Sequence, residues 1–258
     1  MASRVEQLPG FVRWPCHSVQ RTTLNRHDRY GLYCWRQHTD GHPFVIDEPK
    51  DPVFDEAFQV QLETLLAWRR DVRRFRLDPL LNGMIESLIS TASFAPSVGN
   101  AQPWRFVNVT SPQSREALAN HVDATSQRAA LACDPARACA YRELKLHGLR
   151  EAPAVLVIFS DEVPTAGHRL GVAAMPEMLR YSTVMAIHTL WLAARARGIG
   201  LGWVSIVETQ TVTALLDVPK QWSLIAVLCL GHPEHASTLP ELQTKGCQSR
   251  LPVVVAER

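Results

Sequence analysis

The feature that most restricts the fold of this chain is an unbroken apolar run, Ala154–Phe159, bounded by Pro153 and Asp161. A strand with one solvated face alternates apolar and polar residues, whereas a continuous apolar run indicates a strand that is buried on both faces. Such a strand lies inside a sheet that helices cover on both sides. The run therefore predicts a sheet between two layers of helices.

A long helix is predicted from Glu177 to Arg197, and it is apolar on nearly every side between Met185 and Ala196. Because it has no wide polar face for water, it belongs in a core or a subunit interface. His188 and Trp191, which lie on it, are by default core or interface residues.

The remaining periodic segments contain both helices and strands and no internal repeat. They indicate an α+β fold with a central mixed sheet flanked by helices. Further strands are expected over 104–109, 203–207 and 224–230. Helices are expected over 54–68, 138–149 and 212–216. Two more helices should begin at proline, one from Asp78-Pro79 through Ile89 and one from Ser111-Pro112 through Leu118.

The chain divides into two regions of different character. Residues 1–50 are rich in Arg, His and aromatic residues without a sustained period, which indicates an extension of unknown role, and residues 51–258 form the regular domain. Cys34, His38 and His42 in the first region do not predict a metal site, because the sequence around Asp40-Gly41 is turn-like and no helix face gathers them.

Composition excludes several classes of protein. The 258 residues are 46% hydrophobic with a formal net charge of +2, which is too small to indicate a nucleic-acid surface. The six cysteines form no C-x-x-C pair, so neither a zinc ribbon nor a disulfide framework is indicated. Without a signal-peptide run or a membrane-length apolar stretch, we expect a cytoplasmic protein.

Two neighbouring segments carry the chemistry. Residues 69–75, Arg-Arg-Asp-Val-Arg-Arg-Phe, crowd four cations around one carboxylate, and residues 95–104, Ala-Pro-Ser-Val-Gly-Asn-Ala-Gln-Pro-Trp, form a small-residue turn with hydroxyl and amide groups. Guanidinium groups bind phosphate bidentately, and amides at a glycine turn can hydrogen-bond a ring that approaches the backbone. This pair suits a phosphorylated planar ligand such as flavin mononucleotide (FMN).

Each motif also has an ordinary structural interpretation. The arginine cluster could be a solvated charge run that pairs with Asp71 and Asp78. Asp71 partly cancels the field that attracts an anion, so within a binding site it needs a further role, either proton transfer or the ordering of an arginine. Ser205 alone is more simply a strand serine. Gly198-Ile199-Gly200-Leu201-Gly202 closes a helix and enters a strand, which favours a helix C-cap over a dinucleotide fingerprint.

Four motifs in order resemble the nitroreductase-like flavoproteins and, among them, the BluB family of 5,6-dimethylbenzimidazole synthases in cobalamin biosynthesis. These are the two segments above, Met175-Pro176-Glu177 with residues 179–182, and residues 200–206. Ordinary nitroreductases tend to carry Ser where this chain has Asp71. The resemblance implies a nitroreductase-like homodimer with flavin at the subunit interface.

It also implies a reaction in which reduced FMN is the substrate and dioxygen the co-substrate. The flavin would be fragmented, its ribityl C1′ would become C2 of 5,6-dimethylbenzimidazole, and erythrose 4-phosphate would be released. The resemblance assigns Asp71 to proton handling, Ser205 to the dioxygen side of the flavin, and Met175, Pro176 and Glu177 to a lid. Flavin contacts would come from Arg69, Arg70, Arg73, Ser97, Asn100, Gln102 and Arg250.

Since a lid would leave little room for a nicotinamide, a separate flavin reductase would supply the reduced FMN. No metal, nucleic acid or membrane partner is expected. Two alternatives stay open: an NAD(P)H-dependent nitroreductase that recycles bound FMN, and a non-catalytic flavin-binding protein.

Overall fold

The computed structural model describes residues 51–131, 145–246 and 248–258. The expected N-terminal extension, with Cys34, His38 and His42, lies outside these residues. Most of the helix expected over 138–149 lies outside them too.

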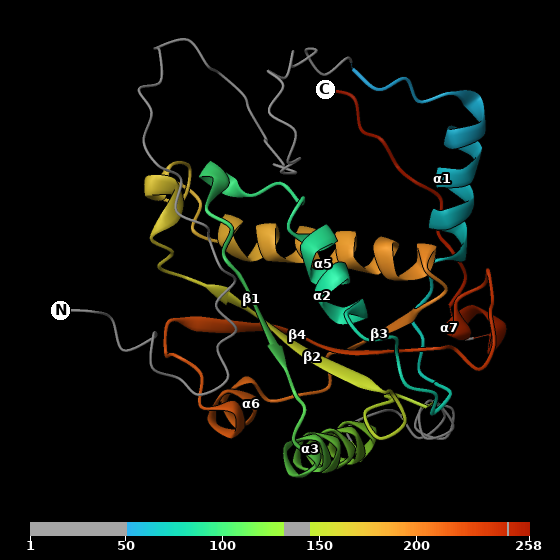
Figure 1. Cartoon of the computed structure of the whole chain (residues 1–258), viewed down its shortest axis with the longest axis vertical. Coiled ribbons are helices and arrows are strands. Elements are labelled where there is room, and N and C mark those ends of the chain that lie inside the picture. The colour runs from blue at the N-terminus through green and yellow to red at the C-terminus, as the bar shows by residue number, and fades with distance from the viewer. Residues whose placement is uncertain (1–50, 132–144, 247) are drawn as a thin grey trace, which may run out of the picture. The chain divides into compact units, whose positions relative to one another are not determined.

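The sheet has four strands in the spatial order β1 (Trp104–Asn108), β2 (Ala154–Asp161), β4 (Trp222–Gly231) and β3 (Gly200–Val204) (Figure 1). β2 is buried from Val155 to Asp161, so the strand predicted from the apolar run is confirmed as buried on both faces. All three strand pairs are antiparallel, which corrects the expected mixed sheet. Among the described residues, parallel pairing is confined to an isolated bridge between Asp71 and Leu201.

Helices cover both faces of this sheet, as predicted (Figure 1). On one face lie α5 (Met178–Ala196) and α2 (Met84–Ala92). Ile187 and Leu190 of α5 pack here with Leu156 and Ile158 of β2. On the other face, α3 (Pro112–Leu131) and α6 (Thr209–Leu216) bury Leu118, Val122 and Val212 against Val155, Val157 and Phe159 of β2. Because successive side chains of β2 point to opposite faces of the sheet, they pack into two separate cores, one on each face.

Helix α1 (Glu56–Trp68) begins after Asp55, whose Oδ1 accepts a hydrogen bond of 2.8 Å from the Phe58 amide. None of its residues is buried within the described chain. Its apolar side chains, Phe58, Leu62, Leu66 and Trp68, are between 38% and 42% exposed. The amphipathic pattern therefore predicted the helix correctly, but the described residues of this chain cover its apolar face only in part.

Three predicted boundaries are wrong. Asp78 does not cap a helix, because its carboxylate pairs with Arg76 at 2.6 Å and α2 begins only after Gly83, which has a φ of 77°. β3 ends at Val204, so Ser205 follows the strand instead of lying inside it. Residues 145–148 are not helical. At Gly148 a Cβ would come within 2.5 Å of the Phe75 ring.

The described residues also form three short helices: η2 (Val98–Asn100), η3 (Ala166–Arg169) and α7 (Glu241–Thr244). Within the described ranges, no helix combines the length and the apolar character that crossing a membrane requires.

Candidate functional site

The arginine segment leaves α1 at Trp68 and continues along the outer edge of β3. The Val72 amide donates to the Leu201 carbonyl at 3.0 Å, so this segment caps the exposed edge of the sheet. Glycines in β3 make that approach possible. A Cβ at Gly202 would stand 2.0 Å from the Val72 carbonyl oxygen, and one at Gly200 would stand 2.9 Å from a Val72 methyl group.

The three glycines of residues 198–202 therefore serve two purposes. Gly198 caps α5: its φ is 73°, it donates to Arg195, and the Ile199 amide donates to the Ala194 carbonyl at 2.9 Å. This is the left-handed helix ending that glycine favours, and it confirms the predicted C-cap. Gly200 and Gly202 instead admit the arginine segment.

Asp71 is held by two hydrogen bonds of different origin. Its Oδ1 accepts from the backbone amide of Trp203 at 2.8 Å, and its Oδ2 accepts from Nε of Arg73 at 2.8 Å. Its side chain is 31% exposed. The carboxylate is therefore fixed in direction while it stays accessible to a ligand.

Arg73 is the ordered arginine of this arrangement. Besides Asp71, its guanidinium donates to the Lys145 carbonyl at 3.4 Å and lies 3.7 Å from the carboxylate of Glu241. Asp71 thus orders Arg73, and the same pair is expected of a charge run that forms ion pairs, so the role of Asp71 within a binding site stays a prediction. A contact between Arg73 and flavin stays a prediction.

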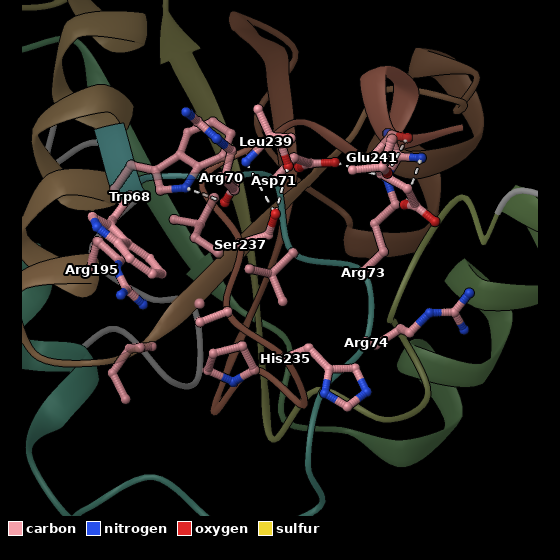
Figure 2. A pocket seen from close by; sticks show the side chains of 18 of the residues that line it. Trp68, Arg70, Asp71, Arg73, Arg74, Arg195, His235, Ser237, Leu239 and Glu241 are labelled. Atoms are coloured by element: carbon pink, nitrogen blue, oxygen red, sulfur yellow. Dashed lines mark hydrogen bonds and ion pairs between the residues drawn. The ribbon is translucent and has the colours of Figure 1, made fainter. Parts of the chain in front are cut away.

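Asp71 and its neighbours line a pocket of about 400 Å³ (Figure 2). Three stretches of chain meet there: residues 68–74, the end of α5 with the start of β3, and residues 233–245. Basic and polar side chains make up one part of the wall, namely Arg70, Arg73, Arg74, Arg195, Lys245, His235, Ser237 and Thr244, and apolar side chains with the carboxylates of Asp71 and Glu241 make up the rest. The pocket is therefore suited to a ligand that has both an anionic group and an apolar part.

Arg70 is a second cation of this wall whose side chain is fixed by hydrogen bonds. Its Nε donates to the Thr238 carbonyl at 2.7 Å, and its Nη1 donates to the Arg69 carbonyl at 2.6 Å. Burial lowers the pKa of Arg70, and the positive charges of Arg69 and Arg250 lower it further. The positive charge of Arg250, a residue predicted from the sequence to contact the flavin, is therefore felt at the Arg70 guanidinium, as is that of Arg69. Such converging positive charge favours a bound anion.

The Ser97–Gln102 turn lies elsewhere. Ser97 accepts a hydrogen bond from the Gln102 amide at 3.1 Å, and the Gln102 side chain donates to the Asn100 Oδ1 at 3.2 Å. Asn100 and Gln102 are exposed and have φ values of 54° and 46°, a conformation that costs energy for residues other than glycine. The turn therefore presents two oriented amide side chains to the outside.

The pocket and this turn contact different ends of α5. The turn is fixed where the Val98 amide donates to the Ser182 hydroxyl at 3.0 Å, whereas the pocket contacts α5 at Trp191 and Arg195. At 1.5 Å per residue, Ser182 and Trp191 lie about 13 Å apart along the helix. One chain thus does not bring the two predicted halves of the flavin site together.

The expected lid is beside the turn. Met175, Pro176 and Glu177 are exposed and directly precede α5. The flanking Val172 and Leu179 are buried with Ala101 of the turn. This packing attaches the segment to the turn, and its role as a lid stays a prediction.

Ser205 is exposed just past the end of β3. It comes two residues after Trp203, whose amide binds Asp71, so about 7 Å of backbone separates the two positions. Ser205 does not line the pocket. Ser205 therefore follows the strand whose Trp203 amide binds Asp71, and its catalytic role stays a prediction.

Comparison with known proteins agrees with this architecture. The model of the nitroreductase family matches residues 66–232, from the end of α1 to the end of β4. The chain belongs to the nitroreductase family. The fold of this nitroreductase-family chain is also found in the crystal structure of oxidized iodotyrosine deiodinase bound to FMN and 3-iodo-L-tyrosine. The two share 22% identity with a TM-score of 0.62, over 76% of this chain and 98% of the other.

Relatives of higher identity within the nitroreductase family are 5,6-dimethylbenzimidazole synthases. The one from Rhodospirillum rubrum is 51% identical over 207 residues, which cover 80% of this chain and 98% of the relative. One from Rhodobacter capsulatus is 45% identical over 199 residues, covering 77% of this chain and 96% of the relative.

Several residues that line the pocket were not identified as site residues from the sequence. His235, Ser237 and Lys245 follow the last strand in a stretch without periodicity, and no motif marked them. Trp191 was interpreted as a core or interface residue, but it lines the pocket. The four arginines within residues 69–74 could have pointed to Trp191 as a site residue, because a guanidinium group often stacks on an indole.

Proposed function

We propose that this protein is a 5,6-dimethylbenzimidazole synthase that fragments reduced FMN with dioxygen and releases erythrose 4-phosphate. The observation that carries the proposal is the 51% identity that extends over 98% of a synthase chain. The reduced flavin supplies both the electrons for dioxygen and the carbon skeleton of the product. The protein's residues bind it, exclude water and move protons.

Binding of the phosphate is assigned to Arg69, Arg70 and Arg250. Burial and, after it, the repulsion of Arg69 and Arg250 lower the pKa of Arg70, and a dianionic phosphate would relieve that repulsion. The cavity of about 400 Å³ falls in the range of about 300–1,000 Å³ that small-molecule sites occupy. The residues present therefore fit a phosphorylated ligand.

Asp71 is assigned to proton transfer. The Trp203 amide and Arg73 hold its carboxylate in one orientation, which a group that exchanges protons with a bound ring requires. Ser205, farther along the same edge of β3, is assigned to the side of the ring where dioxygen reacts.

We propose a homodimer as the active form. Two observations support it: the turn and the pocket contact opposite ends of α5, and α1 exposes Phe58, Leu62 and Leu66. In a symmetric dimer, the Ser97–Gln102 turn of one copy could complete the pocket of the other. A separate flavin reductase would then deliver reduced FMN in the cytoplasm, and residues 175–177 would close over it.

The proposal is tested by following flavin absorbance through one anaerobic reduction and one pulse of air. We expect irreversible bleaching, together with 5,6-dimethylbenzimidazole detected by chromatography. Full return of the oxidised flavin spectrum without product would contradict the proposal. The same trace separates the alternatives. A nitroreductase would recycle its flavin while oxidising NAD(P)H with a nitroaromatic acceptor, and a flavin-binding protein would do neither.

A further inference from the structure

Trp191, on the C-terminal half of α5, makes two contacts with the start of the arginine segment. Its indole N–H donates to the Arg70 carbonyl at 3.3 Å, and the guanidinium carbon of Arg69 stands 4.8 Å from the centre of its ring. Trp191 therefore contacts two of the three arginines that are assigned to the phosphate.

These contacts hold a stretch of chain that has left its helix. Arg69 ends α1 with an extended backbone, and the next contact with the sheet is the Val72 amide on Leu201. Between these two points, the bond from Trp191 fixes the Arg70 peptide. The Arg70 side chain is fixed separately, on the carbonyls of Thr238 and Arg69.

Stacking on the indole also restricts Arg69. A guanidinium group over an aromatic face keeps its edge available for hydrogen bonds while its long side chain loses freedom. Trp191 lies beside Trp203, with ring centres 6.4 Å apart, and the Trp203 amide binds Asp71. The indole of Trp191 thus contacts the arginines directly and packs beside the residue whose backbone amide holds the carboxylate.

We propose that Trp191 is a positioning residue for the phosphate of the flavin: it preorganises Arg69 and Arg70 before the ligand arrives. The proposal rests on the proposed function in that the ligand is reduced FMN. Preorganisation adds affinity because the ordering of the arginines no longer opposes binding.

A purely structural role for Trp191 predicts a different outcome. If the indole only filled space, its loss would weaken every flavin equally or lower the melting temperature. If it positions the arginines, its loss weakens FMN, while riboflavin, which has the same ring system without the phosphate, binds nearly as before.

The test is titration of the full chain with FMN and with riboflavin, followed by flavin fluorescence. Trp191→Phe keeps an aromatic face and removes the N–H donor, so we expect about fivefold weaker FMN binding, the value of one hydrogen bond. Trp191→Leu also removes the aromatic face and should weaken FMN binding by more than tenfold. Riboflavin affinity should change less than about twofold in both variants, which also demonstrates a folded site.

Trp222→Phe is the matched control, since Trp222 lies on β4, packs against Phe159 and does not line the pocket. It should leave both affinities unchanged. An Arg70→Gln background provides a second measurement that does not depend on riboflavin. There, Trp191→Phe should lower FMN affinity by a smaller factor than it does in the wild type, because one of the two arginines that Trp191 positions is gone.

Unchanged FMN affinity in Trp191→Phe, equal losses for FMN and riboflavin, or full additivity with Arg70→Gln would overturn the positioning role. These outcomes are independent of the reaction. If the wild-type protein binds FMN but makes no 5,6-dimethylbenzimidazole, the proposed function fails while the binding data still decide the role of Trp191.

Discussion

Asp71 is oriented by a backbone amide on one oxygen and by a guanidinium group on the other. The backbone donor cannot be removed by mutating a side chain, so the carboxylate keeps one anchor in any variant of Arg73. The sequence indicated that an acid among arginines has a special role. It could not identify Trp203 as the second partner, because the amide belongs to a strand that is 132 residues away.

Asp71→Asn separates orientation from proton transfer. The amide oxygen of Asn can still accept from Trp203, so FMN affinity should change less than about threefold, whereas the product rate should fall by about 100-fold or more. Chromatography of product and flavin fluorescence measure the two quantities. Asp217→Asn is the control, since Asp217 is exposed at the end of α6 with a left-handed φ of 46° that Asn tolerates. Wild-type synthesis by Asp71→Asn would refute the proton-transfer role.

At the scale of secondary structure, the candidate site depends on contacts among β3, α5 and the arginine segment. Their existence was predictable from apolar periodicity, as β2 and α5 illustrate. Their ends were less predictable, because tertiary contacts decide them. Gly200 and Gly202 resemble turn residues in the sequence, but they belong to a strand in which close approach of Val72 excludes a Cβ.

A glycine substitution in β3 should therefore be more harmful than one at the preceding helix end. Gly202→Ala places a methyl group on the Val72 carbonyl and should destabilise the fold by about 3 kcal/mol, with a loss of FMN affinity. Gly198→Ala meets no atom within 4 Å and should cost about 1 kcal/mol for its left-handed backbone, with FMN affinity unchanged. Denaturant unfolding and FMN titration measure both effects, and equal losses in the two variants would contradict this explanation.

A second element-level prediction concerns the contact between α3 and residues 147–150. Burial raises the pKa of Asp123, but hydrogen bonds and charge from His147 and Arg150 outweigh it, so the net pKa is below its usual value. A carboxyl group with a lowered pKa stabilises the folded state above its unfolded pKa of about 4, and this contribution is lost as pH falls further.

We therefore expect the free energy of unfolding to decrease as pH falls below about 4, and Asp123→Asn to make that decrease shallower. Urea unfolding at a series of pH values measures the slope, with Asp217→Asn as the control for removal of an exposed carboxylate. An unchanged slope in Asp123→Asn would show that this ion pair does not contribute to acid sensitivity.

For the whole molecule, the main question is how two half-sites on opposite ends of one helix act on one ligand. The sequence placed both motifs within 35 residues and predicted that both contact one flavin at a subunit interface, without assigning them to one copy or to two. Distance along the chain could not reveal that α5 separates them, because that depends on which turns of the helix each motif contacts.

Mixing two inactive variants tests whether the site is shared between copies. Arg70→Gln damages the pocket and Gln102→Ala damages the turn, so each protein alone should make little product. In a mixed dimer one site carries both defects and the other carries none. With random pairing of equal amounts, product formation should recover to about a quarter of the wild-type rate. No recovery would indicate that each site is built within one chain.

The connection of the turn to Ser182 and of the arginine segment to Trp191 restricts how this protein can change over evolutionary time. Inserting or deleting a single residue between these positions would rotate one attachment by about 100° relative to the other and shift it by about 1.5 Å. Surface loops of homologues are therefore free to vary in length, but the nine-residue interval from Ser182 to Trp191 should be free of gaps wherever the chemistry is retained.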